Sequence, residues 1–175
     1  MPSSVDCSCT AKCDRRITTA KPSRVAVFDS RVSDLSTLLA GLQPDVQSFV
    51  LDADRDGIEQ ISEILEQAPA DELTVVAHGF CGGLHIGDRA LTLSNLPHYE
   101  HQLRNWFSGK TSPSLTLLAG EVAQRTTGKA FVSQLTTITG ATVRASAMPI
   151  GQGHWLTATA KTFRPLVLNT YSATL

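Results

Sequence analysis

The sequence of 175 residues lacks the features that mark several large classes of protein. Its formal net charge is only -1, whereas a nucleic-acid-binding protein usually carries a clear excess of basic residues. No apolar run approaches the roughly 18 residues that a transmembrane helix needs. The first twenty residues also lack the apolar stretch of a secretory signal peptide. We therefore expect a cytoplasmic protein that neither binds nucleic acid nor spans a bilayer.

The composition is that of a folded chain, with 42% hydrophobic and 18% charged residues. A length of 175 residues suits one domain. The charge is uneven: residues 1–24 hold five basic and two acidic residues, a balance of +3, and the remainder holds ten basic and fourteen acidic, a balance of -4. We expect an irregular tail over residues 1–23 and a single domain over residues 24–175. The basic tail is either a solvated segment or a docking arm for an acidic partner.

Three of the four cysteines crowd into the tail, and the fourth is Cys81. The tail spacing C-x-C-x3-C could hold a soft metal ion with a fourth ligand from Cys81 or a histidine, but it lacks the paired C-x2-C knuckles of most zinc modules. A disulfide within the tail and reduced thiols are the alternatives, and the missing export signal favours reduced thiols. No cofactor is expected, and the candidate tail contacts for a metal or a protein partner are Cys7, Cys9, Cys13, Arg15 and Arg16.

Beyond the tail, short apolar runs alternate with amphipathic stretches. Strands are expected at 25–28, 46–51, 73–77, 114–118 and 142–145, and a hairpin over 84–93 that turns at 87–88. Helices are expected after Ser33, after Asp56, over 96–107 and up to Gly140. Residues 153–156 should begin a last extended piece, with Trp155 closing the core. This alternation predicts an α/β three-layer sandwich with a mainly parallel sheet.

In such a sheet, sites lie at the carboxyl ends of the strands, near a change in strand order. That edge should carry six residues: Asp29, Asp52, His78, Gly120, Glu121 and Ser146. The acidic residues Asp29, Asp52 and Asp56, beside Arg31 and Arg55, could bind a cation or a basic side chain. Helix capping and ion pairing with the arginines is the structural alternative, with Arg31–Asp56 as the expected contact.

The pair His78-Gly79 is the most suggestive chemical feature. A histidine at the end of a core strand could act as a general base, and the glycine after it allows a sharp turn. The structural alternative is a histidine that caps the sheet edge through a hydrogen bond. The string around this pair also approaches the lipase elbow G-x-S-x-G, but no serine occupies the required position.

Several stretches in order resemble one bacterial family, the domain-of-unknown-function family numbered 4347, over roughly residues 24–157. They are VFDSRV at 27–32, VLD with RDGIEQI at 50–61, VAHG at 76–79, GLHIG at 83–87 and GKAFV at 128–132. The family is common in cyanobacteria and proteobacteria and resembles the caspase-like clan of cysteine peptidases. The resemblance implies a caspase-like fold, with a base at His78 and a nucleophilic cysteine after the next core strand.

The chain departs from the family pattern at the second element, where Gly120 stands in place of the cysteine. Glycine has no side chain to attack a carbonyl, so covalent catalysis through this position is excluded. Cys81 is an alternative nucleophile beside His78, and Glu121 could form an acid–base pair with the same histidine. Since Cys81 belongs to the histidine loop itself, we do not expect it to aim at the same carbonyl.

We therefore expect no enzyme but a caspase-like pseudoenzyme that binds another protein as an accessory subunit of a larger assembly. A photosynthetic complex is one such assembly that the family's occurrence in cyanobacteria suggests. The alternatives are a cysteine hydrolase that uses His78 and Cys81, and a tail that binds metal through Cys7, Cys9 and Cys13.

Overall fold

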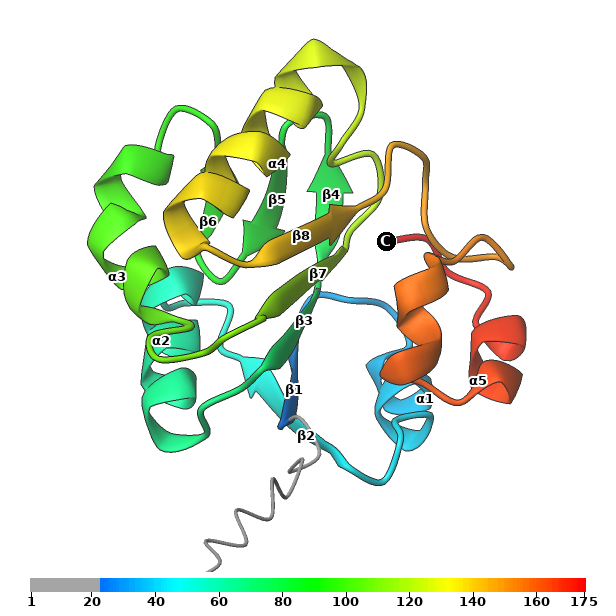
Figure 1. The fold of residues 1–175 in the computed structure, drawn as a ribbon. Helices are drawn as coiled ribbons and strands as arrows, with labels where there is room; N and C mark the ends of the chain where they lie inside the picture. Colours follow the sequence, from blue (N-terminus) through cyan, green and yellow to red (C-terminus); the bar gives the residue numbers. More distant parts are fainter. Residues whose placement is uncertain (1–22) are drawn as a thin grey trace, which may run out of the picture.

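The computed structural model describes residues 23–175 and is built on a five-stranded parallel sheet (Figure 1). The strand order is β2-β1-β3-β7-β8, an order common to doubly wound α/β proteins. The strands are β1 (Arg24–Asp29), β2 (Val46–Leu51), β3 (Glu72–Val76), β7 (Ser114–Leu118) and β8 (Thr142–Ala145). All four pairings are parallel. The expected three-layer α/β arrangement with a parallel sheet is confirmed.

One face of the sheet is covered by α2 (Gly57–Gln67), α3 (Glu100–Asn105) and α4 (Arg125–Thr139), which lie together in Figure 1. Alternate strand residues such as Val25 and Val27 point into this core, because successive side chains of a strand face opposite sides. The buried residues of α4 are spaced at helical intervals, with Phe131, Leu135 and Ile138 facing the sheet.

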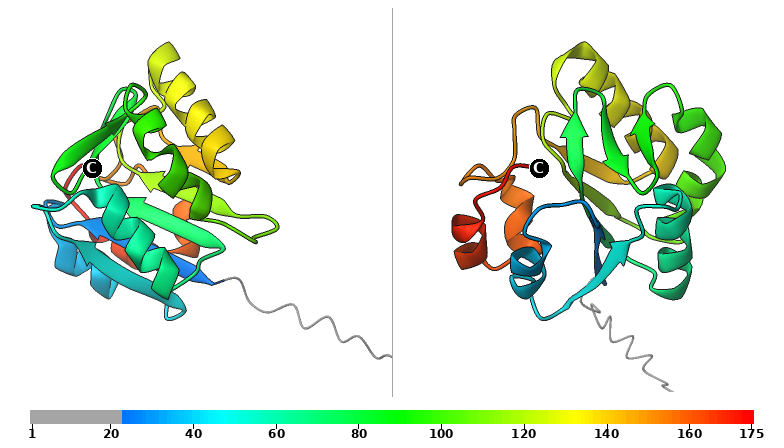
Figure 2. Two further views of the ribbon diagram at one scale, coloured as in Figure 1. Left: turned by 90° about the vertical axis from the view of Figure 1, so that its left-hand side faces the viewer. Right: turned by 180° about the vertical axis from the view of Figure 1, so that it is seen from behind.

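The opposite face is covered by α1 (Leu35–Ala40), the 3₁₀ helix η2 (Thr157–Lys161) and α5 (Pro165–Thr170). This second core takes the intervening strand residues, such as Ala26 and Phe28, together with Leu38 of α1 and Leu168 of α5. Figure 2 shows these helices gathered on the side of the sheet away from α3 and α4.

A small antiparallel sheet of β4 (His78–Phe80), β5 (Gly83–Ile86) and β6 (Arg89–Thr92) follows β3. The hairpin that the sequence predicts over 84–93 is confirmed, with its turn at Gly87. The 3₁₀ helix η1 (Leu96–Tyr99) then leads into α3. Within residues 23–175, no helix is long and apolar enough to cross a membrane.

Two local predictions are wrong. The cap residue of α1 is Asp34 rather than Ser33, and its left-handed backbone (φ 50°) leaves it without a side-chain cap bond. The extended piece expected from residue 153 is absent, since residues 157–170 form η2 and α5 instead. Trp155 does pack against the second core, where its Nε1 donates to Leu168 O at 2.8 Å and its ring lies 5.6 Å from that of Tyr171.

Candidate functional site

The carboxyl edge of the sheet carries the residues that the sequence places there. Asp29 ends β1, and Asp52 directly follows β2. His78 and Gly120 each come two residues after a strand, β3 and β7, and Ser146 directly follows β8. The strand order changes direction between β1 and β3, so Asp29 and His78 flank the point where ligands bind in many open α/β sheets.

Asp29 is buried in a hydrogen-bonded cluster with Arg31 and the turn of the β5–β6 hairpin. Its two carboxylate oxygens accept bonds of 2.9 Å each from Nε and Nη2 of Arg31, and the Gly87 amide donates at 2.8 Å. Burial alone would raise the pKa of Asp29, but the hydrogen bonds from Arg31 and Gly87 outweigh it and lower the pKa from its ordinary value. Asp29 therefore fixes the hairpin to the edge and has no free oxygen to offer a ligand.

The expected contact between Arg31 and Asp56 is wrong. Arg31 forms a two-point pair with Asp29, two residues earlier in the chain. Asp56 instead caps α2 by accepting bonds from the amides of Ile58 and Glu59, and it accepts a 2.6 Å bond from the hydroxyl of Tyr99. The structural alternative of capping and local pairing thus describes these carboxylates.

The turn after β2 is closed by the side chain of Gln60, which is 6% exposed. Its Oε1 accepts from the Asp52 amide at 2.8 Å, and its Nε2 donates to Asp52 O at 3.0 Å and to Arg55 O at 3.2 Å. An amide nitrogen therefore occupies the inside of this acidic turn. No feature of the sequence pattern singled out Gln60.

Residues 52–63 also carry the spacing D-x-D-x-D-G-x5-E of calcium-binding loops. Here the last carboxylate of that pattern, Glu63, pairs with Arg55 at 2.8 Å, and Asp56 is engaged as a helix cap. Within the described residues 23–175, no three His, Cys, Asp or Glu side chains come together as metal ligands. The tail residues Cys7, Cys9, Cys13, Arg15 and Arg16 lie outside the described residues.

His78 is half-buried and makes one polar contact, between its Nε2 and Arg31 O at 3.3 Å. Across the small sheet it pairs in register with His85. In the part of the chain that the structure describes, no hydrogen bond joins the His78 imidazole to Cys81 or Glu121. The sequence therefore placed His78 at the edge correctly, and neither of the alternative partners, Cys81 and Glu121, forms a hydrogen bond with it.

Cys81 and Glu121 are both held by Gln124, in the loop after β7. The Cys81 Sγ donates to Gln124 O at 3.0 Å, and Glu121 Oε1 accepts from Gln124 Nε2 at 2.9 Å. Cys81 also lines an open cavity of about 390 Å³ with Phe80, Thr127 and neighbouring residues. The backbone is left-handed at Glu121 (φ 61°) and at Arg125 (φ 57°), a conformation that residues other than glycine rarely adopt.

Gly120 is enclosed by backbone on two sides. A Cβ atom at Gly79 would lie less than 3.0 Å from the Gly120 main chain, and a Cβ atom at Gly120 would lie less than 3.0 Å from Leu175 O. The Gly120 amide donates to that same oxygen at 3.0 Å. Glycine at 79 thus makes room for the 119–120 backbone, and glycine at 120 makes room for Leu175.

The sequence did not predict that Leu175 would lie at this edge. In Figure 1 the last residue, marked C, lies beside the carboxyl ends of β3 and β7. The Leu175 amide donates to Ile150 O at 2.9 Å, and the Leu175 side chain is only 5% exposed. Residues 173–175 therefore cover Gly120.

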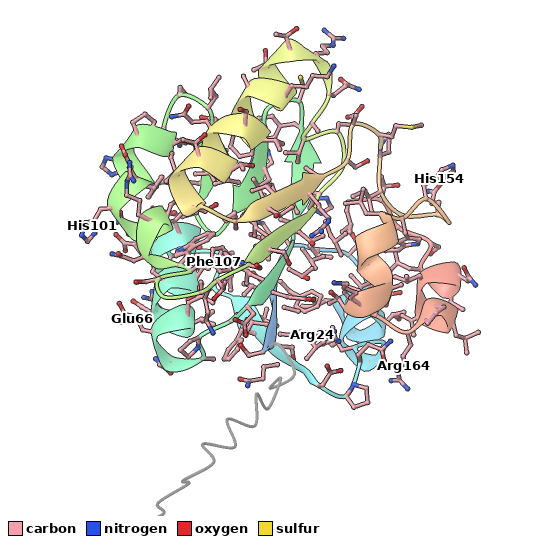
Figure 3. All side chains as sticks on the ribbon, in the orientation of Figure 1. Arg24, Glu66, His101, Phe107, His154 and Arg164 are labelled. Carbon is pink, nitrogen blue, oxygen red and sulfur yellow. The ribbon has the colours of Figure 1, made fainter. Side chains whose placement is uncertain are left out.

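A second cavity, of about 280 Å³, lies away from the edge between α2 and α3. Its lining includes Leu65, Glu66, His101, Trp106 and Lys110, and Figure 3 shows Glu66 and His101 on the outer side of these helices. Sequence reasoning did not point to it, because its residues come from two amphipathic helices and form no motif.

Comparison with family models matches residues 25–175 to DUF4347, a domain of unknown function. No curated protein matches the chain. Among solved structures, a P. pentosaceus protein described as an NADPH-quinone reductase is similar at 12% identity and a TM-score of 0.45. That similarity covers 84% of this chain and 94% of the other, and at this level it carries no statement about activity. Since the family match extends over residues 25–175, beyond the expected limit at 157, the chain belongs to the DUF4347 family.

Proposed function

We propose that this chain is a non-catalytic module with a caspase-like arrangement, which acts by binding another protein. The observation that carries the proposal is the surroundings of Gly120. The resemblance places a nucleophilic side chain there, yet the position has none, and Leu175 O occupies the space that a Cβ atom would need. A nucleophile at this position would require residues 173–175 to move.

The remaining reactive groups of the edge support the same proposal. Among residues 23–175, the thiol of Cys81 and the carboxylate of Glu121 each bond to Gln124, and neither bonds to His78. The contact between the His78 imidazole and Arg31 O suits a role in holding the loop after β1. General base catalysis needs hydrogen-bond reach between the base and its nucleophile.

One observation favours a second candidate, a cysteine hydrolase, because Cys81 lines an open cavity of about 390 Å³. The two candidates differ in the reactivity of this thiol. We would label native protein with iodoacetamide at pH 6 and compare the Cys81 rate with its rate in the urea-unfolded chain, using wild type and His78→Ala. A thiol bonded to a carbonyl should react more slowly in the native state, and at the same rate in both proteins. Labelling faster than in urea that His78→Ala abolishes would refute the non-catalytic assignment.

The binding role is tested by the native size of the endogenous protein in gently lysed source cells. The proposal expects migration in a complex well above the 18.8 kDa of the single chain. In this proposal the chain is an accessory subunit, and a photosynthetic complex is the first assembly to examine. Migration as a free 18.8 kDa chain would count against it.

A further inference from the structure

Residues 173–175 are held at the edge mainly through their backbone. The Gly120 amide donates to Leu175 O at 3.0 Å, and the Leu175 amide donates to Ile150 O at 2.9 Å. Thr174 forms an antiparallel bridge with Gly151. This is the main-chain pattern by which proteins bind extended peptides next to an existing strand or loop.

Two glycines shape the seat of this segment. A Cβ atom at Gly120 would meet Leu175 O, and one at Gly151 would meet Ala173 O, in both cases at less than 3.0 Å. Gly120 and Gly151 therefore lie so close to the backbone of residues 173–175 that a side chain at either position would exclude this segment. We call this seat, formed by Gly120, Ile150 and Gly151, the edge groove.

The edge groove favours a particular type of side chain at one position of the segment that it binds, the position of Leu175. Leu175 is 5% exposed and belongs to the second core together with Leu118, Ile150 and Tyr171. An aliphatic residue is favoured at this position because burial of its apolar side chain is stabilising. A charged residue in its place would lose its hydration with no partner to replace it.

The edge groove continues past its present occupant into an unfilled space. A cavity of about 270 Å³ beside Thr174 is lined by Met148, Gln152 and His154 among others, and Met148 is 63% exposed. Figure 3 shows His154 on the loop at the outer margin of this region. Thr174 leaves this cavity unfilled, so the edge groove has room for a larger residue at that position.

We infer that the edge groove is a peptide-binding site that residues 173–175 fill in cis. When they leave, it takes an extended segment of another polypeptide with an aliphatic residue at the Leu175 position. The inference rests on the proposed binding function and identifies the surface that performs it. Ser172 and Thr174 are exposed, so the short segment is held by few contacts, and release of such a segment does not require global unfolding.

The test is a titration of the ¹⁵N-labelled full chain with a synthetic, amidated peptide of residues 169–175, followed through the Gly120 and Ile150 amide signals. In wild type the tethered segment competes at an effective concentration in the millimolar range, so binding in trans should be at least about tenfold weaker than in an emptied groove. Leu175→Asp empties the edge groove, because it would bury an unpaired carboxylate. We expect saturable shifts at these two amides in Leu175→Asp and much weaker ones in wild type.

Controls separate specific binding from other results. A matched peptide with aspartate in place of its leucine should not bind, and adding Gly120→Ala to Leu175→Asp should block the site. If Leu175→Asp fails to fold, Leu175→Ala replaces it, since it weakens the same contact without adding a charge. A folded variant without shifts, or equal binding by wild type and variant, would overturn the inference. A wild-type dimer that the peptide does not displace would also overturn it, because a second copy would then be the occupant.

The outcome is independent of the labelling of Cys81. Absence of peptide binding would remove the edge groove as the docking surface and leave the non-catalytic assignment standing. Fast, His78-dependent labelling of Cys81 would refute that assignment whatever the peptide does.

Discussion

Gly120→Cys would place a thiol where the proposed resemblance expects one, and it tests whether Leu175 limits the residue at this position. The new Cβ atom would lie less than 3.0 Å from Leu175 O, a distance that real Cβ atoms essentially never show, so residues 173–175 must move away. Their release loses about 1.5–3 kcal/mol from the burial of the Leu175 side chain and about 1 kcal/mol for each of two hydrogen bonds. The freed backbone regains roughly 1 kcal/mol per residue over three residues, which leaves a net cost of about 0.5–2 kcal/mol.

Urea unfolding followed by tryptophan fluorescence measures this cost. The matched comparison is a double-mutant cycle in which Gly120→Cys is also made in a chain that lacks residues 173–175. In that background the contact with Leu175 O is gone and only the milder contacts with Pro149 Cα and Ile150 N remain, so the substitution should cost less than in the full chain. An equal cost in both backgrounds, or no cost in the full chain, would refute the reasoning.

Three further predictions follow from the hydrogen-bonded side chains. Asp29→Asn should cost about 1.5–3 kcal/mol in urea unfolding at pH 7, because it removes the charge from buried hydrogen bonds. Since the pKa of Asp29 is lowered, this advantage of wild type holds above pH 4 and disappears as the pH falls through the folded pKa. A stability difference that persists in acid would contradict this prediction. Gln60→Glu should cost on the order of 2–4 kcal/mol at pH 7, because a carboxylate would face the backbone oxygen of Asp52. The cost should be smaller at pH 4, where this carboxylate is protonated. An unchanged urea midpoint would show that the amide is not needed. Tyr171→Phe should cost about 1 kcal/mol through the lost 2.9 Å bond to Ser33 O. Burial raises the pKa of Tyr171 to about 12, so wild type should lose stability between pH 10 and 12 and the variant should lose less, as urea unfolding at pH 8 and 11 would show.

The strands and helices of the core could be predicted because each of them shows its pattern of apolar residues within a short stretch of sequence. The three central strands β1, β3 and β7 are buried on both faces, and such strands appear as short apolar runs. In α4 the residues Phe131, Leu135 and Ile138 repeat at helical spacing, so the helix and its inward face could both be predicted. Gly140, with φ 67°, marks its end as expected.

The structure after residue 150 could not be predicted, because that region lacks such a local pattern. Of the two leucines of α5, Leu166 is 75% exposed, whereas Leu168 is buried. A helix of six residues shows too few turns for an apolar stripe to be seen. The extended piece expected there was therefore wrong, and only packing against α1 and the sheet determines η2 and α5.

At the candidate site, the sequence located residues but not their partners. The chain order of strands and polar residues was enough to place Asp29 and His78 at one edge. It did not show that Arg31 would pair with Asp29 rather than with Asp56, because a long flexible side chain can pair with a residue near or far along the chain. That choice depends on the hairpin turn at Gly87, which docks on the same cluster.

By itself, the sequence determined the alternation of strands and helices, the edge where polar residues gather, and the absence of a nucleophile at Gly120. These properties belong to side chains and to their spacing along a short stretch of chain. The tertiary structure alone decided that Leu175 would cover Gly120 and that Gly79 and Gly151 would admit other segments. Those contacts are made by backbone N–H and C=O groups, which are the same in nearly every residue, so the sequence carries no mark of which distant segment will meet them.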